Sequence, residues 1–273
     1  MSRQFRPPYF LCCCLEFPVA PRWLAKKGRI QEARSVLQLA GEQDYELELQ
    51  QIVDSIGIEQ QQAGEALFSR KHLFPIFLGV SVALFNQLSG INVILYYLND
   101  IFAQAGFSKV SGNLQAVTIG ATNLVFTMLA MSVIDRIGRK TLLLIGSVGT
   151  AVCLAGVSGI FFTGRHHCAL LWLLIAYIAF FAFSQGAVIW VYLAEVFPNN
   201  IRAKGQSLGS FTHWIMNASI SGIFPVLAAT SGGYPFLFFS LMMVLQFFVV
   251  WLVYPESKGI SLEEMQRKLA TAR

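Results

Sequence analysis

One stretch of the chain combines several amide side chains with an absence of charge. Residues 73–99 contain no Asp, Glu, Lys or Arg, and within them lies NQLSGINVILYY, which runs from Asn86 to Tyr97. Asn and Gln side chains donate and accept hydrogen bonds without carrying a charge. A buried amide in lipid is costly unless it has a partner. These amides are therefore expected either to hydrogen-bond neighbouring helices or to face a water-filled cavity that binds an uncharged polar ligand.

The composition indicates that lipid solvates most of the chain. Of its 273 residues, 55% are hydrophobic and 13% are charged, whereas about a quarter of a soluble domain is charged. A spanning helix needs roughly 20 mainly apolar residues, and a β-barrel is disfavoured because the apolar runs do not alternate with polar residues. The charge-free runs, with a turn at TSGGYP, predict six spanning helices at about 73–99, 112–134, 141–162, 169–194, 205–229 and 234–254.

The basic residues predict the topology. They cluster at every second expected membrane crossing, whereas the opposite loops hold only Lys109 and Arg165. Because positive residues mark the cytoplasmic side, both ends of the six-helix unit are expected in the cytoplasm. The net charge of +5 therefore reports topology, and the sequence contains no nucleic-acid-binding motif.

The expected fold is an all-α transmembrane bundle preceded by a cytoplasmic helical segment. Residues 1–17 are not assigned to any element. Residues 18–72 are charged, and their apolar positions recur at the spacing of short amphipathic helices; they include Ile30, Ala33, Leu47, Leu49 and Val53. The six-helix bundle is expected over 73–255 and a cytoplasmic tail over 256–273.

Three expected cytoplasmic loops hold charges of both signs. They contain the sequences DRIGRK, EVFPNNIRAK and PESKG. One interpretation is a simple positive-inside anchor. The other is a salt-bridge network that stabilises one conformation of a moving protein, with the candidate members Asp135, Arg136, Arg139, Glu195, Arg202 and Glu256.

These motifs resemble those of the sugar porter family of the major facilitator superfamily. The resemblance rests on APRWLAKKGRIQEARSVL, QLSGIN, DRIGRK, EVFPNNIRAKG and PESKG, which occur in the family's order across residues 21–259. It covers nearly the whole chain but only half of the family's fold, namely the cytoplasmic linker and the C-terminal six helices. The linker departs from the family where FPVAPRWL has Val19 and Ala20 in place of Glu and Ser.

The resemblance implies a sugar-binding site built from amides and indoles. Sugar hydroxyls donate and accept hydrogen bonds, as amides do, and an indole offers an apolar plate with one N–H donor. The implied sugar contacts are Gln87, Asn92, Asn86, Asn123, Trp190, Gln185, Trp214 and Asn217, with Tyr96 and Tyr97 as outer gates. Plain interhelical packing is the alternative role for each of them.

Three further features bear on the implied site. The prolines that the family commonly has around Trp190 are replaced by Ala187 and Ile189, which puts the local helix bend in doubt. His213 is interpreted as a packed helix residue rather than a proton carrier. Thr127 shares a helix face with Asn123, because the two residues are four positions apart.

The implied function is transport of a monosaccharide, hexose or pentose, by alternating access against a second six-helix bundle. No catalytic triad, phosphate loop or metal site occurs in the sequence, so neither an enzyme nor a cofactor is expected. Proton symport and uniport stay open, since the coupling carboxylate of symporting relatives lies in the other half of their fold. The alternatives are a sugar-sensing receptor and a non-transporting remnant that needs a separate N-terminal half or self-association. The expected location is the cell membrane.

Overall fold

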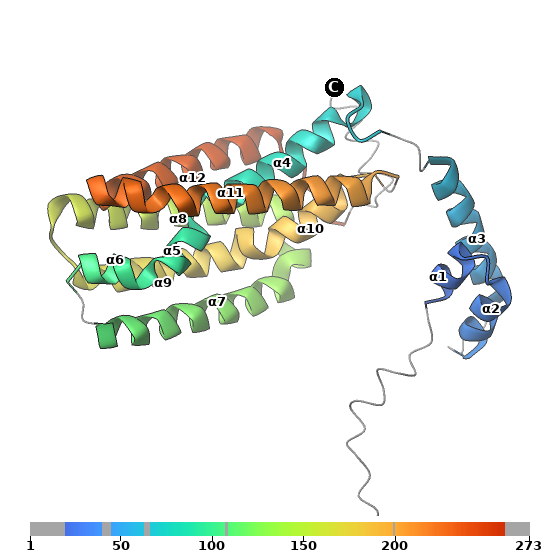
Figure 1. The fold of residues 1–273 in the computed structure, drawn as a ribbon, viewed down its shortest axis with the longest axis horizontal. Helices are drawn as coiled ribbons and strands as arrows, with labels where there is room; N and C mark the ends of the chain where they lie inside the picture. Colours follow the sequence, from blue (N-terminus) through green and yellow to red (C-terminus); the bar gives the residue numbers. More distant parts are fainter. Residues whose placement is uncertain (1–19, 40–44, 63–65, 107–108, 199, 260–273) are drawn as a thin grey trace, which may run out of the picture. The chain divides into compact units, whose positions relative to one another are not determined.

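The computed structural model describes residues 20–39, 45–62, 66–106, 109–198 and 200–259, and within these ranges every regular element is a helix (Figure 1). The chain divides into two compact units, residues 1–65 and 66–273. The unassigned stretch 1–17 and residues 260–273 of the expected tail lie outside the described residues.

The first unit is a small cluster of three helices. These are α1 (Pro21–Lys26), α2 (Ile30–Leu39) and α3 (Tyr45–Gln62). Their shared core contains Leu24, Ala33, Leu37, Leu49 and Ile56. Leu49 and Ile56 lie two helical turns apart on one face of α3, whereas Leu47 lies off that face and stays 57% exposed. Val53 is near the same face as Leu49 but is 41% exposed.

The second unit is a bundle of long helices that run roughly along one direction (Figure 1). Helix α8 packs against α9 and α12, and α4 packs against α11. After the short 3-10 turn Arg70–His72, the helices are α4 (Leu73–Leu88), α5 (Ile91–Tyr96), α6 (Leu98–Gln104), α7 (Lys109–Ile137), α8 (Arg139–Thr163), α9 (Cys168–Phe181), α10 (Ala187–Val196), α11 (Arg202–Thr230) and α12 (Gly233–Val253).

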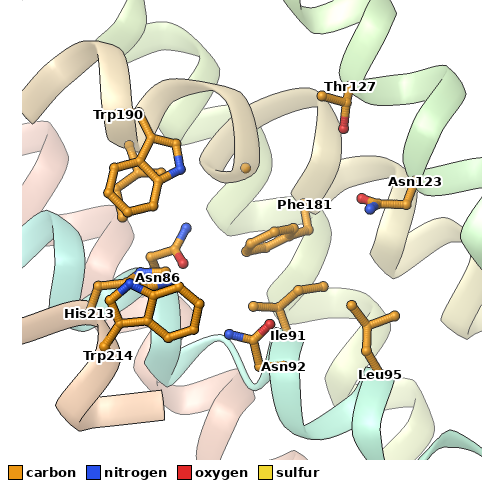
Figure 2. Close-up of a pocket in the computed structure, with 12 residues that line it drawn as sticks. Asn86, Ile91, Asn92, Leu95, Asn123, Thr127, Phe181, Trp190, His213 and Trp214 are labelled. Atoms are coloured by element: carbon orange, nitrogen blue, oxygen red, sulfur yellow. The ribbon is translucent and has the colours of Figure 1, made fainter. Parts of the chain in front are cut away.

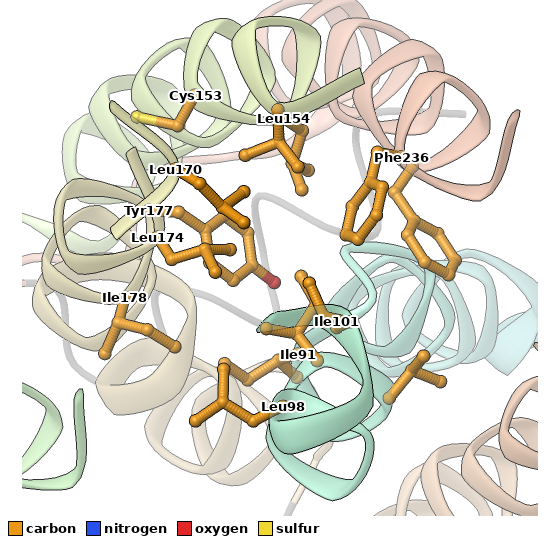
Figure 3. Close-up of a cluster of buried hydrophobic side chains, with 14 of the residues drawn as sticks. Ile91, Leu98, Ile101, Cys153, Leu154, Leu170, Leu174, Tyr177, Ile178 and Phe236 are labelled. Carbon is orange, nitrogen blue, oxygen red and sulfur yellow. The ribbon is translucent and has the colours of Figure 1, made fainter. Parts of the chain in front are cut away.

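Two apolar clusters fill this bundle on either side of the amides of α4. One cluster includes Leu78 and Val82, which precede the amides in the chain. The other includes Ile91 and Ile94, which follow them. Tyr177 points into the middle of the second cluster (Figure 3), where its hydroxyl donates to the Ser89 carbonyl at 3.0 Å. Asn86 and Gln87 therefore lie between two layers of apolar packing.

The first expected span is broken at Gly90. Helix α4 ends at Leu88, and Gly90 has a φ of +82°, in the left-handed region that other residues rarely adopt. The Phe239 ring occupies the place where a Cβ atom of residue 90 would sit. A glycine inside QLSGIN predicts that the helix can break locally at this position, and the structure confirms the break. It separates Gln87 on α4 from Asn92 on α5 and lets both approach one site.

The fourth expected span, 169–194, is also interrupted. A π-helical turn, η2 (Ala182–Gly186), lies between α9 and α10. Wider turns of this kind leave backbone groups available and often occur at functional sites. Here the Gln185 carbonyl accepts a hydrogen bond from Asn86 Nδ2 at 3.4 Å. The interruption thus exists without the family's prolines.

Among the described residues, five helical segments are long and apolar enough to cross a membrane, judged by length and composition: Arg70–Tyr96, Ala116–Ile137, Arg139–Thr163, Cys168–Val196 and Gly233–Val253. The remaining expected span, 205–229, lies within α11. Polar residues such as Gln206, His213 and Asn217 lower the hydropathy of this helix.

Candidate functional site

The amides of α4 and α5 lie at a pocket of about 300 Å³ in the second unit. Helices α4, α5, α7, α9, α10 and α11 all contribute side chains, and Gly186 lies in the π-helical turn. The volume is near the lower end of the range for small-molecule sites. The lining residues are Asn86, Ile91, Asn92, Leu95, Asn123, Thr127, Phe181, Gly186, Ile189, Trp190, His213 and Trp214.

Gln87 lies behind one wall of the pocket and contacts the polar side chains of that wall. It is 2% exposed and does not line the pocket. Its Nε2 donates to Asn86 Oδ1 at 3.3 Å and lies 3.0 Å and 3.1 Å from the two ring nitrogens of His213. Its Oε1 accepts from Asn92 Nδ2 at 3.1 Å. We call Asn86, Gln87 and Asn92 the amide chain.

Two indoles flank His213 at this wall. The ring centroids of Trp190 and Trp214 each lie 5.2 Å from that of His213. The indoles stay 46% and 59% exposed, whereas His213 is 7% exposed. An indole offers an apolar face and one N–H donor. The two rings therefore present apolar surface and two donors beside the amide chain.

The opposite wall comes from α7. Asn123 and Thr127 lie across the pocket from Trp190, His213 and Trp214, and Phe181 lies between the two walls (Figure 2). Asn123 and Thr127 are four residues apart, which places both side chains on one face of α7. The pocket thus has polar uncharged groups on both sides of an apolar floor.

Four other residues that the sequence placed at the site lie outside the pocket lining. Gln185 is 1% exposed, and its Nε2 lies 3.2 Å from Met243 Sδ. Asn217 Nδ2 donates to the Tyr96 hydroxyl at 3.3 Å. The Tyr97 hydroxyl donates to the Ser221 carbonyl at 3.1 Å. Both tyrosines therefore connect α5, or the turn after it, to α11.

His213 and Phe181 are pocket residues that the sequence reasoning did not assign. From the sequence, His213 is interpreted as a packed helix residue. A signal was available, because His213 lies next to Trp214 and four residues before Asn217, which places it on the face of Asn217. Phe181 offers no such signal, since it is one of 23 phenylalanines in an apolar chain.

A second polar group lies where α7 ends and α8 begins. Arg139 Nη2 pairs with Glu195 Oε1 at 2.7 Å, and its Nη1 pairs with Asp135 Oδ1 at 2.8 Å. Glu256 accepts from the backbone N–H groups of Arg139 and Lys140 at 2.9 Å and 3.1 Å. A carboxylate at the N-terminus of a helix is stabilised by the unpaired N–H groups there.

The remaining members of the expected charge network make backbone contacts. Lys258 Nζ donates to the Arg136 carbonyl. Arg202 Nε donates to the Phe197 carbonyl at 3.4 Å. Ser257 Oγ donates to Glu195 Oε2 at 2.7 Å and so links PESKG to the Arg139 pair. The structure therefore brings Asp135, Arg139, Glu195 and Glu256 together and leaves the Arg202 side chain beside its own loop.

The side chains that line the pocket are suited to an uncharged polar molecule. The twelve lining residues include no Asp, Glu, Lys, Arg or Cys, and His213 is the one histidine among them. Amides and indole N–H groups can hydrogen-bond hydroxyl groups, and the aromatic faces can cover an apolar ring surface.

The comparisons with known proteins agree with this chemistry. A glucose facilitated diffusion protein of Zymomonas mobilis is 35% identical over 265 residues, which cover 94% of this chain and 56% of the relative. The D-xylose-proton symporter of Escherichia coli is 33% identical over 265 residues, which cover 94% and 54%. Both relatives are transporters by name.

A solved structure extends the similarity to the fold. The proton:xylose symporter of the major facilitator superfamily, bound to 6-bromo-6-deoxy-D-glucose, matches with a TM-score of 0.78 and 32% identity, over 95% of this chain and 56% of the symporter. The chain thus spans about half the length of the relatives that it matches. The family described as sugar (and other) transporter matches residues 2–269, and the chain belongs to this family.

Proposed function

We propose that this chain binds a monosaccharide in the pocket of the amide chain and transports it as the C-terminal half of a sugar porter. The observation that carries the proposal is the hydrogen-bonded arrangement of Asn86, Gln87 and Asn92 beside Trp190 and Trp214. Amides offer paired donors and acceptors to hydroxyl groups, and the indoles offer apolar plates to a sugar ring.

A second six-helix bundle is part of this proposal. The pocket leaves Trp190 and Trp214 about half exposed, and polar pocket groups that face lipid are costly. Helix α7 carries Asn123 and Thr127, and within its span Ala116–Ile137 only 17% of the residues in the most apolar 18-residue stretch are buried. A partner bundle over this side would close the pocket and provide the opposing half for alternating access.

The membrane arrangement follows the charge pattern. We infer six spans, with α11 as the polar span that faces the central site, and both ends of the bundle in the cytoplasm of a cell membrane. Helices α1–α3 then form a cytoplasmic linker. The cluster of Arg139, Glu195 and Glu256 lies on the cytoplasmic side, where it would stabilise one of the two access states.

Coupling to protons is outside this proposal. The relatives include both a proton symporter and a facilitated diffusion protein, at 33% and 35% identity. The pocket lining of this chain holds no carboxylate. A coupled mechanism would therefore place its carboxylate elsewhere in the complete transporter.

Equilibrium dialysis of the purified chain against labelled D-glucose and D-xylose tests the proposal. Gln87→Ala removes the junction of the amide chain, and Asn92→Ala removes the amide that reaches the pocket. Each variant is expected to weaken binding about tenfold or more, because buried partners are left unpaired.

The matched control is Asn99→Ala, which removes an exposed amide of α6 that is not a pocket residue. It is expected to bind the sugar as the parent chain does. Folded Gln87→Ala protein with unchanged affinity for both sugars would refute the assigned site.

A further inference from the structure

His213 is the one ionisable side chain among the residues that line the pocket. It is 7% exposed and lies between the rings of Trp190 and Trp214. His213 lies on α11, and its ring nitrogens face the amide of Gln87 on α4, at 3.0 Å and 3.1 Å from Gln87 Nε2. The proposed function gives this histidine no role.

The contact with Gln87 depends on the charge of the ring. A neutral imidazole has one nitrogen that accepts a hydrogen bond, whereas an imidazolium has two donors and no acceptor. Gln87 Nε2 is itself a donor. The observed contact is therefore satisfied only while His213 is neutral, and a protonated ring requires Gln87 to present Oε1 instead.

The amide of Gln87 cannot turn alone. Its Oε1 accepts from Asn92 Nδ2 at 3.1 Å, and its Nε2 donates to Asn86 Oδ1 at 3.3 Å. Asn86 Nδ2 in turn donates to the Gln185 carbonyl at 3.4 Å. A turned Gln87 would place donor against donor and acceptor against acceptor. Asn92, which lines the pocket, must then turn as well.

We propose that His213 is a positioning residue whose charge sets the direction of the hydrogen bonds along the amide chain. Protonation of His213 reverses the donor and acceptor that Asn92 offers to the pocket. A monosaccharide matched to the neutral arrangement consequently binds less tightly as the pH falls. This last consequence rests on the proposed function, whereas the link between His213, Gln87 and Asn92 does not.

The groups that face His213 do not supply a compensating negative charge. Helices α4 and α5 present amides, and α10 presents Trp190. Of the ionisable side chains on helices that contact α11, Glu195 on α10 pairs with Arg139 and accepts from Ser257, and Tyr96 on α5 accepts from Asn217. Beyond the end of α12, the Tyr254 hydroxyl hydrogen-bonds Ser81.

Tryptophan fluorescence of the full-length chain can follow the charge of His213. The chain has five tryptophans, and replacement of the exposed Trp23, Trp172 and Trp251 by Phe leaves the two that flank the histidine. An imidazolium quenches an adjacent indole. Between about pH 8.5 and about pH 5, where histidine ordinarily titrates, we expect a quenching step that His213→Gln abolishes.

Asn92→Ala tests the link through Gln87 without any sugar. Loss of the Asn92 donor frees Gln87 to turn, so protonation becomes easier and the step moves to higher pH by about 0.5 unit or more. Asn123→Ala is the matched control, because Asn123 lines the same pocket but lies on α7, outside the amide chain. It is expected to leave the midpoint in place.

The outcomes separate this inference from the proposed function. Absence of a His213-dependent step, or an equal midpoint in the Asn92→Ala and Asn123→Ala variants, overturns the inference. With labelled D-glucose, the parent affinity should fall about tenfold across the step while His213→Gln gives a flat profile, and equal profiles again overturn it. Shifted midpoints without sugar binding at any pH would support the link and refute the proposed function.

Discussion

Arg139 makes most of the ionic contacts in the charge cluster. Its side chain is 10% exposed, and it pairs with Glu195, which is 23% exposed, and with Asp135, which is 81% exposed. Exposed pairs contribute little to stability, whereas a shielded pair leaves an uncompensated charge when one partner is removed. The contact with Glu195 should therefore account for most of the effect of losing Arg139.

Arg139→Gln is expected to lower the free energy of unfolding by about 1 to 3 kcal/mol. Unfolding of the purified chain by denaturant in detergent would measure the change. Arg136→Gln is the matched control from the same motif, because Arg136 is exposed and its known contact is through its backbone carbonyl. A change of about 0.5 kcal/mol or less is expected there. Equal losses in both variants would contradict this account of the cluster.

At the residue scale, the sequence predicts that Gln87 and Asn92 are candidate site residues. It does not predict that His213 contacts Gln87. Gln87 and Asn92 are recognisable because amides are costly in a charge-free span. Their direct bond also follows from the break at Gly90. The contact of Gln87 with His213 joins residues that are 126 positions apart. A histidine in a helix can be a plain packing residue or part of a hydrogen-bonded site. Which of the two it is depends on partners that are distant in the sequence, and a local sequence pattern does not show them.

Helix breaks determine where the pocket residues meet. Gly90 separates α4 from α5 with a left-handed backbone, and the Phe239 ring fills the space beside its Cα. A side chain at this position would meet two costs, namely backbone strain and overlap with the ring. Gly106 has a similar φ of +88°, but nothing lies within 4 Å of its Cβ position.

Gly90→Ala should therefore be much more costly than Gly106→Ala. We expect a loss of about 3 kcal/mol for the first variant and about 1 kcal/mol for the second, because only the first adds overpacking to strain. Thermal unfolding of both variants in the same detergent would check the order. Similar midpoints for the two variants would show that the Phe239 contact does not constrain this break.

The sequence predicts the helices of the second unit better than their interruptions. Charge-free runs mark helical segments because charged groups are costly in lipid, and a glycine among amides marks the first break. The π-helical turn at Ala182–Gly186 has no such signal, since AFSQG contains no proline and reads as continuous helix. The turn contacts α7 and α8, and no local sequence pattern contains these tertiary contacts.

At the scale of the whole molecule, the site has walls from one bundle only. The chain covers 54% to 56% of the relatives that it matches. Its pocket combines a complete amide wall with indoles that stay about half exposed. The proposal that a second bundle closes the site predicts that sugar movement requires both bundles, although the residues of the amide chain belong to this one.

Sugar uptake with and without a second bundle tests the central claim most directly. Cells that lack their own glucose uptake would express this chain alone, or with the first six helices of the E. coli D-xylose-proton symporter as a separate polypeptide, and co-purification would establish that the two halves assemble. The account predicts saturable uptake of labelled D-glucose or D-xylose only in the assembled pair, and its loss on Gln87→Ala. An assembled pair that moves neither sugar, or uptake that Gln87→Ala leaves unchanged, would contradict it.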